Sequence, residues 1–202
     1  MKTSFPVLIF LLSSSFLFVS GKSRIGEYYL GFGYGLINEN NKAFEGDAIN
    51  LFVNSPGSET VDFDLSYTYA GLETNSSRET YWRFGLNLRY HFDDFYDNQG
   101  MFRPFLGLGV EYLGDSQNLI LEEEGFGWSL EAGTEIAFTQ DLSFIFFAKL
   151  HGLWKDFSYN DFNLNSELTW WMDDEHAFAL SYLHMVDANV DQFILKYMYS
   201  WK

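Results

Sequence analysis

The sequence has no cysteine and few basic residues along its 202 positions. Without cysteine, the chain can form no disulfide, no thiolate nucleophile and no Cys-ligated metal site. Its 12 Lys and Arg against 28 Asp and Glu give a formal net charge of -16. Because phosphate binding needs a basic surface, this charge argues against nucleic acid as a partner.

Long apolar runs are missing after the first 21 residues, so the rest of the chain cannot enter a membrane as helices. The start itself has the features of an export signal. Lys2 supplies a positive end, an apolar run broken only by serines spans 5–19, and small residues follow at 19–21. The run is shorter than the ~20 residues of a spanning helix. We therefore predict a signal peptide over 1–21, cleaved after Gly21, and one domain over 22–202.

Motifs for catalysis and cofactor binding are also missing. We find no nucleotide-binding loop and no nucleophile elbow, and His91, His151 and His184 lie on different segments with no metal-site spacing. The sequence therefore predicts no catalytic residue, no metal and no cofactor.

Aromatic residues are abundant instead, with 22 Phe, 13 Tyr and 6 Trp, and they alternate with small or polar residues. In residues 101–114, one parity carries Phe102, Leu106, Leu108 and Val110, whereas the other carries Arg103, glycines and Glu111, with Phe105 as an exception. Such a period of two is typical of a β-strand with one apolar and one polar face.

The same alternation recurs in ten segments separated by polar breaks, over residues 27–36, 47–54, 61–69, 82–92, 101–114, 128–138, 142–151, 162–170, 178–182 and 193–201. Residues 55–58, Ser-Pro-Gly-Ser, are expected to form a tight turn. An apolar outer face between two interfaces requires a closed sheet, because an open edge in lipid leaves amides unpaired. We predict an all-β fold: a closed, antiparallel, up-and-down transmembrane β-barrel of ten strands.

Charges segregate by parity within these segments, and this supports membrane insertion. Five bases and seven acids fall on the polar parity: Glu27, Asp62, Asp64, Arg83, Arg89, Arg103, Glu111, Glu131, Glu135, Lys149, Glu167 and Lys196. The other bases are assigned to the signal, the termini and the loops: Lys2, Lys22, Arg24, Lys42, Arg78, Lys155 and Lys202. A charge facing lipid at the bilayer midplane costs about 2 to 4 kcal/mol, so the polar parity should face the lumen.

Two alternatives remain open at this point. A soluble, lipocalin-like barrel with aromatics inside and charges outside explains the alternation, but not the lack of strand charges on the aromatic face. Eight strands would result if the short second segment failed to pair.

The chain resembles the small outer-membrane β-barrel proteins of Gram-negative bacteria, of the opacity-type and porin-like family. The likeness rests on residues 103–109 (Arg-Pro-Phe-Leu-Gly-Leu-Gly) with Tyr112, on residues 29–35 (Tyr-Leu-Gly-Phe-Gly-Tyr-Gly) and on an aromatic last strand. It implies a monomer in the bacterial outer membrane, in contact with lipid and lipopolysaccharide and inserted by the barrel assembly machinery. Such barrels usually end on an aromatic residue, whereas Lys202 follows Trp201 here.

A second resemblance is confined to residues 182–189, which are similar to a His-x-Ser-Asn segment of outer-membrane lipid A deacylases. His184 falls on the lipid parity, but Val186 occupies the position of the nucleophile. Acyl transfer without a hydroxyl lacks its attacking atom. A lipid A-modifying activity through His184 is therefore kept only as the alternative function.

Charged residues in so narrow a lumen should pair, since an unpaired buried charge costs several kcal/mol. We expect Arg83, Arg89 and Arg103 to pair with Glu111, Glu131 or Glu135 on neighbouring strands. The barrel would then be structural, or a narrow pore. More acids than bases, and an acidic outer loop at Glu122, Glu123 and Glu124, would favour cations in that pore.

Overall fold

The computed structural model describes residues 23–40, 44–74, 76–92, 102–121, 123–158 and 160–201. The predicted signal peptide and the acidic turn 93–100 lie outside these residues. Ten strands form in sequence order: β1 (Tyr29–Glu39), β2 (Glu45–Ser58), β3 (Val61–Glu73), β4 (Arg78–His91), β5 (Phe102–Asp115), β6 (Gly125–Ala137), β7 (Leu142–Leu153), β8 (Asn160–Trp171), β9 (His176–Met185) and β10 (Val190–Ser200).

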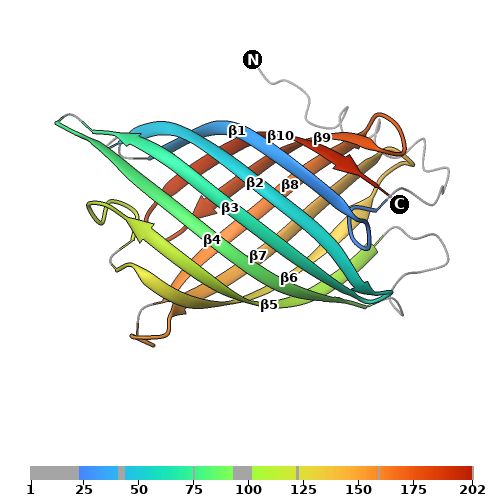
Figure 1. Ribbon diagram of the computed structural model, residues 1–202, viewed down its shortest axis with the longest axis horizontal. Helices are drawn as coiled ribbons and strands as arrows, with labels where there is room; N and C mark the ends of the chain where they lie inside the picture. Colours follow the sequence, from blue (N-terminus) through green and yellow to red (C-terminus); the bar gives the residue numbers. More distant parts are fainter. Residues whose placement is uncertain are drawn as a thin grey trace, which may run out of the picture.

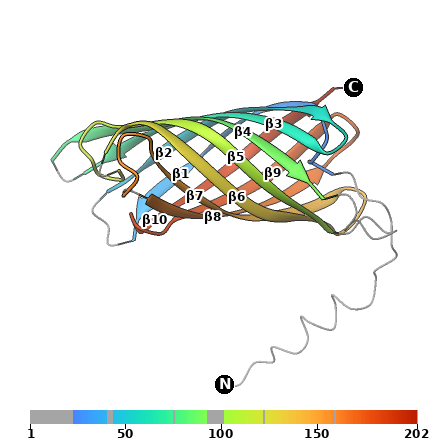
Figure 2. The same cartoon turned by 90° about the horizontal axis from the view of Figure 1, so that it is seen from below.

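Each strand pairs antiparallel with its sequence neighbours, and β1 pairs with β10 from Tyr29 opposite Ser200 to Glu39 opposite Val190. The sheet is thus closed, with strands running obliquely around a barrel (Figures 1 and 2). The ten-stranded antiparallel barrel predicted from the sequence is confirmed. Since β2 pairs with both β1 and β3, the eight-stranded alternative does not form. Across the described ranges, no helix is long and apolar enough to span a membrane.

The barrel has two distinct ends, which we name by the chain termini. At the terminal end, on the right of Figure 1, the described chain enters at Ser23 and leaves at Trp201, and the connections β2–β3, β4–β5, β6–β7 and β8–β9 turn there. At the far end lie the other five connections, of which β5–β6 (116–124) is the longest.

The outer face of the barrel is apolar. In β5, Leu106, Leu108 and Val110 are 51%, 59% and 50% exposed. Phe105 of the same strand points inward and is buried. The same alternation recurs around the barrel, with Leu, Phe and Tyr outside and charged or small residues inside. The soluble alternative, which placed the aromatic parity inside, is therefore wrong.

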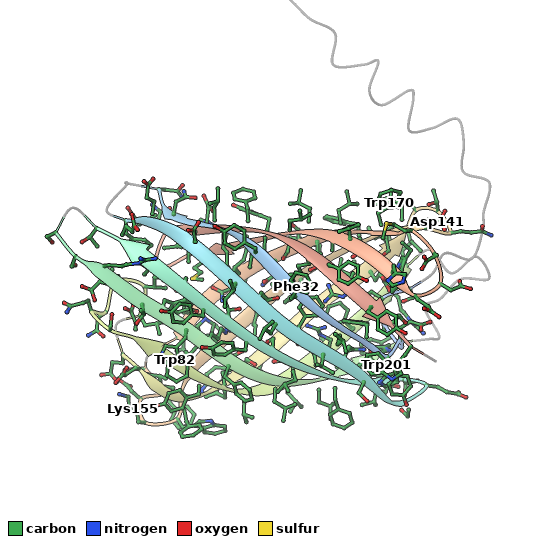
Figure 3. All side chains as sticks on the ribbon, turned by 45° about the horizontal axis from the view of Figure 1, so that its top comes forward. Phe32, Trp82, Asp141, Lys155, Trp170 and Trp201 are labelled. Carbon is green, nitrogen blue, oxygen red and sulfur yellow. The ribbon has the colours of Figure 1, made fainter. Side chains whose placement is uncertain are left out.

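Aromatic side chains gather at both rims of this outer face. Figure 3 places Trp82 near the far end and Trp170 and Trp201 near the terminal end. Trp82 stacks on Tyr112 with ring centroids 4.9 Å apart, and Tyr112 meets Phe126 edge-on at 4.6 Å. Amphipathic rings at two levels are typical of the belts that sit at the two membrane–water interfaces.

The tight turn predicted at 55–58 is wrong, because β2 continues to Ser58 and turns at residues 59–60. Pro56 pairs with Asp62 of β3 but lies beyond Asn54, the last residue of β2 that pairs with β1. Only one side of the strand needs ladder hydrogen bonds there, so proline is tolerated. A register shift between Pro56 and Ser58 marks a bulge at this strand end.

Several charged residues near strand ends were misplaced by the sequence pattern. Arg78 was assigned to a loop but begins β4 opposite Glu73. Asp47 of β2 and Asp191 of β10 lie on the outer face, which was expected to carry no strand charge. Both lie close to the far end, where a charge reaches the headgroup level and its cost falls to about 0 to 1 kcal/mol.

Candidate functional site in the barrel interior

Glu111 is the centre of one cluster of charges inside the barrel. Arg83 of β4 donates to its Oε2 through Nη2 at 2.6 Å and Nε at 3.0 Å. Lys149 of β7 pairs with its Oε1. The carboxylate is only 2% exposed, so two cations from different strands share one buried acid. The expected pair between Arg83 and Glu111 is present.

Arg89 of β4 reaches across β5 to Glu131 of β6, with which it forms an ion pair. Both residues lie opposite Gly107 of β5 in register. A Cβ at this glycine would collide with the Glu131 side chain, so the missing side chain makes room for the pair. The Arg89 guanidinium also lies 5.5 Å from the Phe105 ring, a cation–π contact.

A third cluster includes Arg24, which the sequence pattern assigned to the N-terminus outside the barrel. Arg24 is buried and pairs with Glu167 of β8, whose other oxygen accepts from Lys196 Nζ at 2.7 Å. Its Nε donates to Tyr29 Oη at 2.8 Å. No periodicity could place Arg24, because it precedes the first strand.

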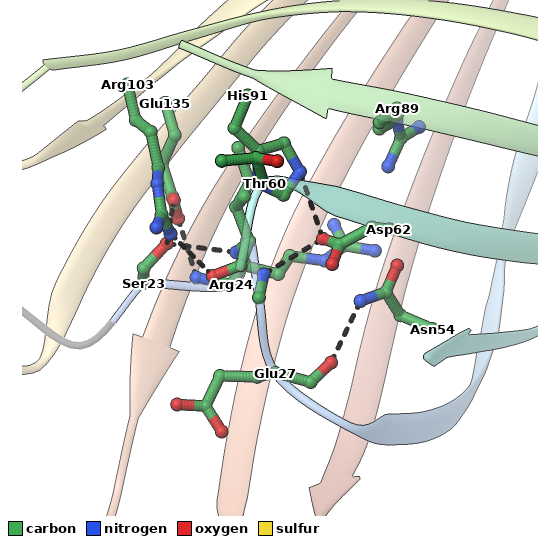
Figure 4. Close-up of polar contacts among 12 residues, drawn as sticks. Ser23, Arg24, Glu27, Asn54, Thr60, Asp62, Arg89, His91, Arg103 and Glu135 are labelled. Carbon is green, nitrogen blue, oxygen red and sulfur yellow. Dashed lines mark hydrogen bonds and ion pairs between the residues drawn. The ribbon is translucent and has the colours of Figure 1, made fainter. Parts of the chain in front are cut away.

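The N-terminal segment, residues 23–28, lies across the lumen at the terminal end (Figure 4). Arg103 Nη1 donates to the Ile25 carbonyl at 2.8 Å and to Ser23 Oγ at 3.1 Å. Glu135 accepts from the Arg24 amide at 2.8 Å. Arg103 and Glu135 thus anchor this segment.

Two further contacts hold the same segment. The Gly26 amide donates to Asp62 Oδ2 at 2.9 Å, and His91 Nε2 lies 3.2 Å from the same oxygen. Ile25 packs against Phe105 and Ile145. These contacts explain why Phe105 of β5 and Ile145 of β7 are apolar although they lie on the lumen side. Both side chains cover Ile25 and do not face lipid.

An apolar cluster lies across the lumen at the far end. We call it the mouth cluster; its buried members are Ile37, Phe44, Ala48, Ala70, Leu72, Tyr81, Leu113, Ile120, Leu121, Leu153, Met185, Val190 and Ile194. Ile120 and Leu121 come from the β5–β6 connection, which folds back into the barrel. Asp115 Oδ2 accepts from the Ile120 amide at 2.6 Å and from the Leu121 amide at 3.1 Å, and so holds this turn.

A carboxyl pair lies beside the mouth cluster. His151 Nε2 is 3.2 Å from Asp161 Oδ2, and Asp161 also shares a side-chain hydrogen bond with Asp187 of the β9–β10 turn. This hydrogen bond raises the pKa of the Asp187 carboxyl. The hydrogen bond between the two carboxyls therefore ties the β9–β10 turn to the start of β8.

Between the two ends the interior contains a cavity of about 140 Å³. Its charged lining consists of Arg24, Arg83, Arg89, Lys149, Lys196, Asp64, Glu131 and Glu167. Serine, threonine, asparagine and glutamine side chains complete most of the remaining wall. The cavity is thus a polar chamber with apolar material at one end and the N-terminal segment at the other.

The predicted interior charges mostly come together, with one exception. Asp62, Asp64, Arg83, Arg89, Arg103, Glu111, Glu131, Glu135, Lys149, Glu167 and Lys196 line the interior. Glu27 instead precedes β1 and is half-exposed; its carbonyl accepts from Asn54 Nδ2 at 2.8 Å while its carboxylate points away from the cluster in Figure 4.

The acidic outer loop has a different role from the interior charges. Glu123 pairs with Lys155 at 3.0 Å, with both side chains largely open to solvent. Glu124 is exposed, and Glu122 lies outside the described residues. Neither Glu123 nor Glu124 lines the cavity or belongs to the mouth cluster.

His184 lies on the outer face as its parity predicted. Its Nδ1 lies 2.8 Å from Asp191 Oδ1, which also accepts from Tyr182 Oη at 2.7 Å. Ser181 lines the cavity on the other side of the wall, and Val186 is exposed without a hydroxyl. Within the described chain, no group of three or more His, Asp and Glu could hold a metal ion.

Comparisons with known proteins agree with this architecture. Residues 9–181 match the family described as the outer membrane protein beta-barrel domain. No curated protein matches the sequence. Among solved structures, the COG4313 outer membrane channel from Pseudomonas putida F1 is 8% identical, with a TM-score of 0.51 over 87% of this chain and 96% of that one.

Two other solved structures are similar at lower TM-scores. The NanC porin is 9% identical, with a TM-score of 0.49 over 87% of this chain and 99% of that one. OprG from Pseudomonas aeruginosa is 10% identical, with a TM-score of 0.43 over 91% of this chain and 99% of that one. At such identities these structures show the fold alone. With the family match over most of its length and a closed barrel that is apolar outside, the chain belongs to the bacterial outer membrane proteins with a β-barrel domain.

Proposed function

We propose that the protein is a porin-type barrel whose lumen is closed at rest by its own side chains and therefore passes solutes poorly. The observation that carries this proposal is the filling of both lumen ends, by the mouth cluster and by the N-terminal segment, around a chamber of only about 140 Å³. The buried charges in between stabilise the wall by pairing. Passage of a solute then requires displacement of both the β5–β6 turn at the far end and the N-terminal segment at the terminal end.

The cation preference expected from the sequence loses its basis around the cavity. It relied on seven acids over five bases and on the acidic loop at 122–124. Of the interior residues, Glu27 points away and Arg24 joins the interior. The cavity lining carries five cations and three carboxylates. We therefore do not extend the cation preference to this proposal, and the reversal potential below tests it.

Planar-bilayer recordings of the refolded barrel test the closed state. We expect the unmodified chain to show little or no conductance. Asp115→Ala combined with Arg103→Ala should raise it, because the Ile120 and Leu121 amides lose their acceptor and the Ile25 carbonyl loses its donor, which releases both ends. A salt gradient in the same recordings gives the ion selectivity.

Asp156→Ala serves as the matched control. Asp156 caps the β7–β8 connection at the same end through Ser158, and it is not part of the mouth cluster. This variant should behave like the unmodified chain. Large, steady conductance before any substitution would overturn the proposal.

Hydrolysis of lipid A acyl esters is the alternative function, and the geometry does not support it. A general base needs a nucleophile within hydrogen-bond reach. The group near His184 is the phenol of Tyr182, and phenols are poor nucleophiles at neutral pH because they stay protonated. We expect purified protein to release no fatty acid from lipopolysaccharide. His184→Ala should leave any conductance unchanged. Acyl release that disappears in His184→Ala would make the protein an enzyme.

The remaining features of the mature protein follow from the same proposal. Cleavage after Gly21 would free the N-terminal segment to enter the lumen from the periplasm, which puts the terminal end in the periplasm and the far end outside. The barrel would be a monomer, inserted by the barrel assembly machinery and surrounded by lipid and lipopolysaccharide.

A further inference from the structure

The central cavity has an excess of positive charge and of hydrogen-bond donors. Its lining holds five cationic side chains and three carboxylates. Glu111, which lies inside the barrel beside the cavity, and Glu167 are each shared by two cations, so five cations face four carboxylates when Glu111 is included. In a low-dielectric interior such an imbalance favours a bound anion.

Two neutral donors point to the same ligand chemistry. Gln192 Nε2 and Asn165 Nδ2 are buried and, within the described part of the chain, have no hydrogen-bond partner. Both residues line the cavity, and Gln192 is 4% exposed. Buried donors normally have an acceptor, so each of these amides is available to a ligand.

The register places these two amides close together. Gln192 of β10 and Asn165 of β8 both lie opposite Leu183 of β9. Neighbouring strands are about 4.8 Å apart, so the two backbones are separated by about 10 Å and their side chains can converge on one ligand. Lys196 lies four residues after Gln192 in β10, on the same face of the strand, and also lines the cavity.

The size of the cavity limits the ligand. An apolar cavity of about 150 Å³ holds one benzene molecule, so about 140 Å³ holds a group of similar size. Carboxylate and phosphate anions of this size carry two or more charged acceptor oxygens, which suit ammonium, guanidinium and amide donors.

We propose that the central cavity is a binding site for one small oxyanion, a carboxylate or a phosphate, held by Gln192, Asn165 and the surrounding cations. This inference goes beyond the proposed function, since a closed barrel needs no ligand. It holds whether or not the lumen conducts.

Urea unfolding of the refolded barrel in detergent micelles tests the proposal. The anion need not enter a closed lumen, because it is present while the chain unfolds and refolds. The probes are sodium lactate and sodium phosphate, compared with sodium chloride at equal ionic strength. A ligand that binds the folded barrel raises the midpoint in a saturable manner. The probe with the larger saturable shift shows whether carboxylate or phosphate is preferred.

The variant is the double substitution Gln192→Met with Asn165→Leu, which removes both donors at similar volume. The control is Gln140→Met, the same change in the exposed β6–β7 turn. We expect the saturable shift in the unmodified chain and in the control, and its loss in the double variant. Phosphate also stabilises proteins by exclusion from their surface, an effect that all three proteins share. No shift beyond chloride, or an equal shift in the double variant, would overturn the proposal.

A charge swap gives a second measurement. Gln192→Glu keeps the size of the side chain and replaces its amide donor by a carboxylate. The stabilisation by both anions should disappear in this variant. Stabilisation that persists would contradict an anion site at Gln192.

Discussion

Replacing Glu111 with leucine is expected to lower the free energy of unfolding by about 3 to 5 kcal/mol. The substitution leaves Arg83 and Lys149 buried without the carboxylate that they share. Burial of an uncompensated charge is costly, because the Coulombic attraction that offset its desolvation is gone. Urea titration of the refolded barrel, followed by tryptophan fluorescence, measures the loss.

Glu123→Leu is the matched control for this experiment. It removes the same side chain from an ion pair with Lys155 that is largely open to solvent. Exposed pairs contribute about 0 to 1 kcal/mol, so its effect should be small. Equal midpoints for the two variants would mean that Glu111 does not neutralise buried cations.

A positive charge on the outer face should destabilise the barrel according to its depth in the membrane. Leu108→Arg, near the middle of β5, should cost about 2 to 4 kcal/mol, and Leu36→Arg, near the far end of β1, about 0 to 1 kcal/mol. Both leucines are 59% exposed in the protein alone, so only their depth differs. Unfolding of both variants in lipid vesicles measures the difference. An equal cost at the two positions would show that lipid does not cover this face.

The sequence predicted the outer face and the strand number well, because both depend on local alternation. Leu106, Leu108 and Val110 share one parity, and the register of β5 with β4 and β6 keeps that parity outside. A one-residue slip would turn the whole set inward, so the pattern specifies the face strongly.

The contents of the lumen were predicted less well, because they depend on contacts between distant segments. Arg24 precedes the first strand, and only Glu135, Glu167 and Tyr29 on the folded barrel determine where it lies. Ile120 and Leu121 lie in a polar connection, and their burial depends on Asp115 turning that connection inward. Neither location follows from a period of two.

Strand ends were the other source of error. The Ser-Pro-Gly-Ser sequence at 55–58 has the composition of a turn, yet pairing with β3 alone extends β2 through it. The turn propensity of these residues is outweighed by their hydrogen bonding to β3. Strand β1 does not pair with them, since its pairing with β2 begins at Tyr29 opposite Asn54.

The lack of cysteine makes thiol labelling the most direct measurement of the closed lumen and of the lipid-facing wall. Two adjacent residues of β9 provide the test, Ser181, which lines the cavity, and Leu180, which is exposed outside. Ser158→Cys, in the exposed β7–β8 connection, reports full access to water. In liposomes, a charged water-soluble thiol reagent should label Ser158→Cys at once. It should label Ser181→Cys only after unfolding, and a bimane attached at Leu180→Cys should be quenched by lipid-bound nitroxide. Rapid labelling of folded Ser181→Cys, or no quenching at position 180, would contradict a closed barrel in the membrane.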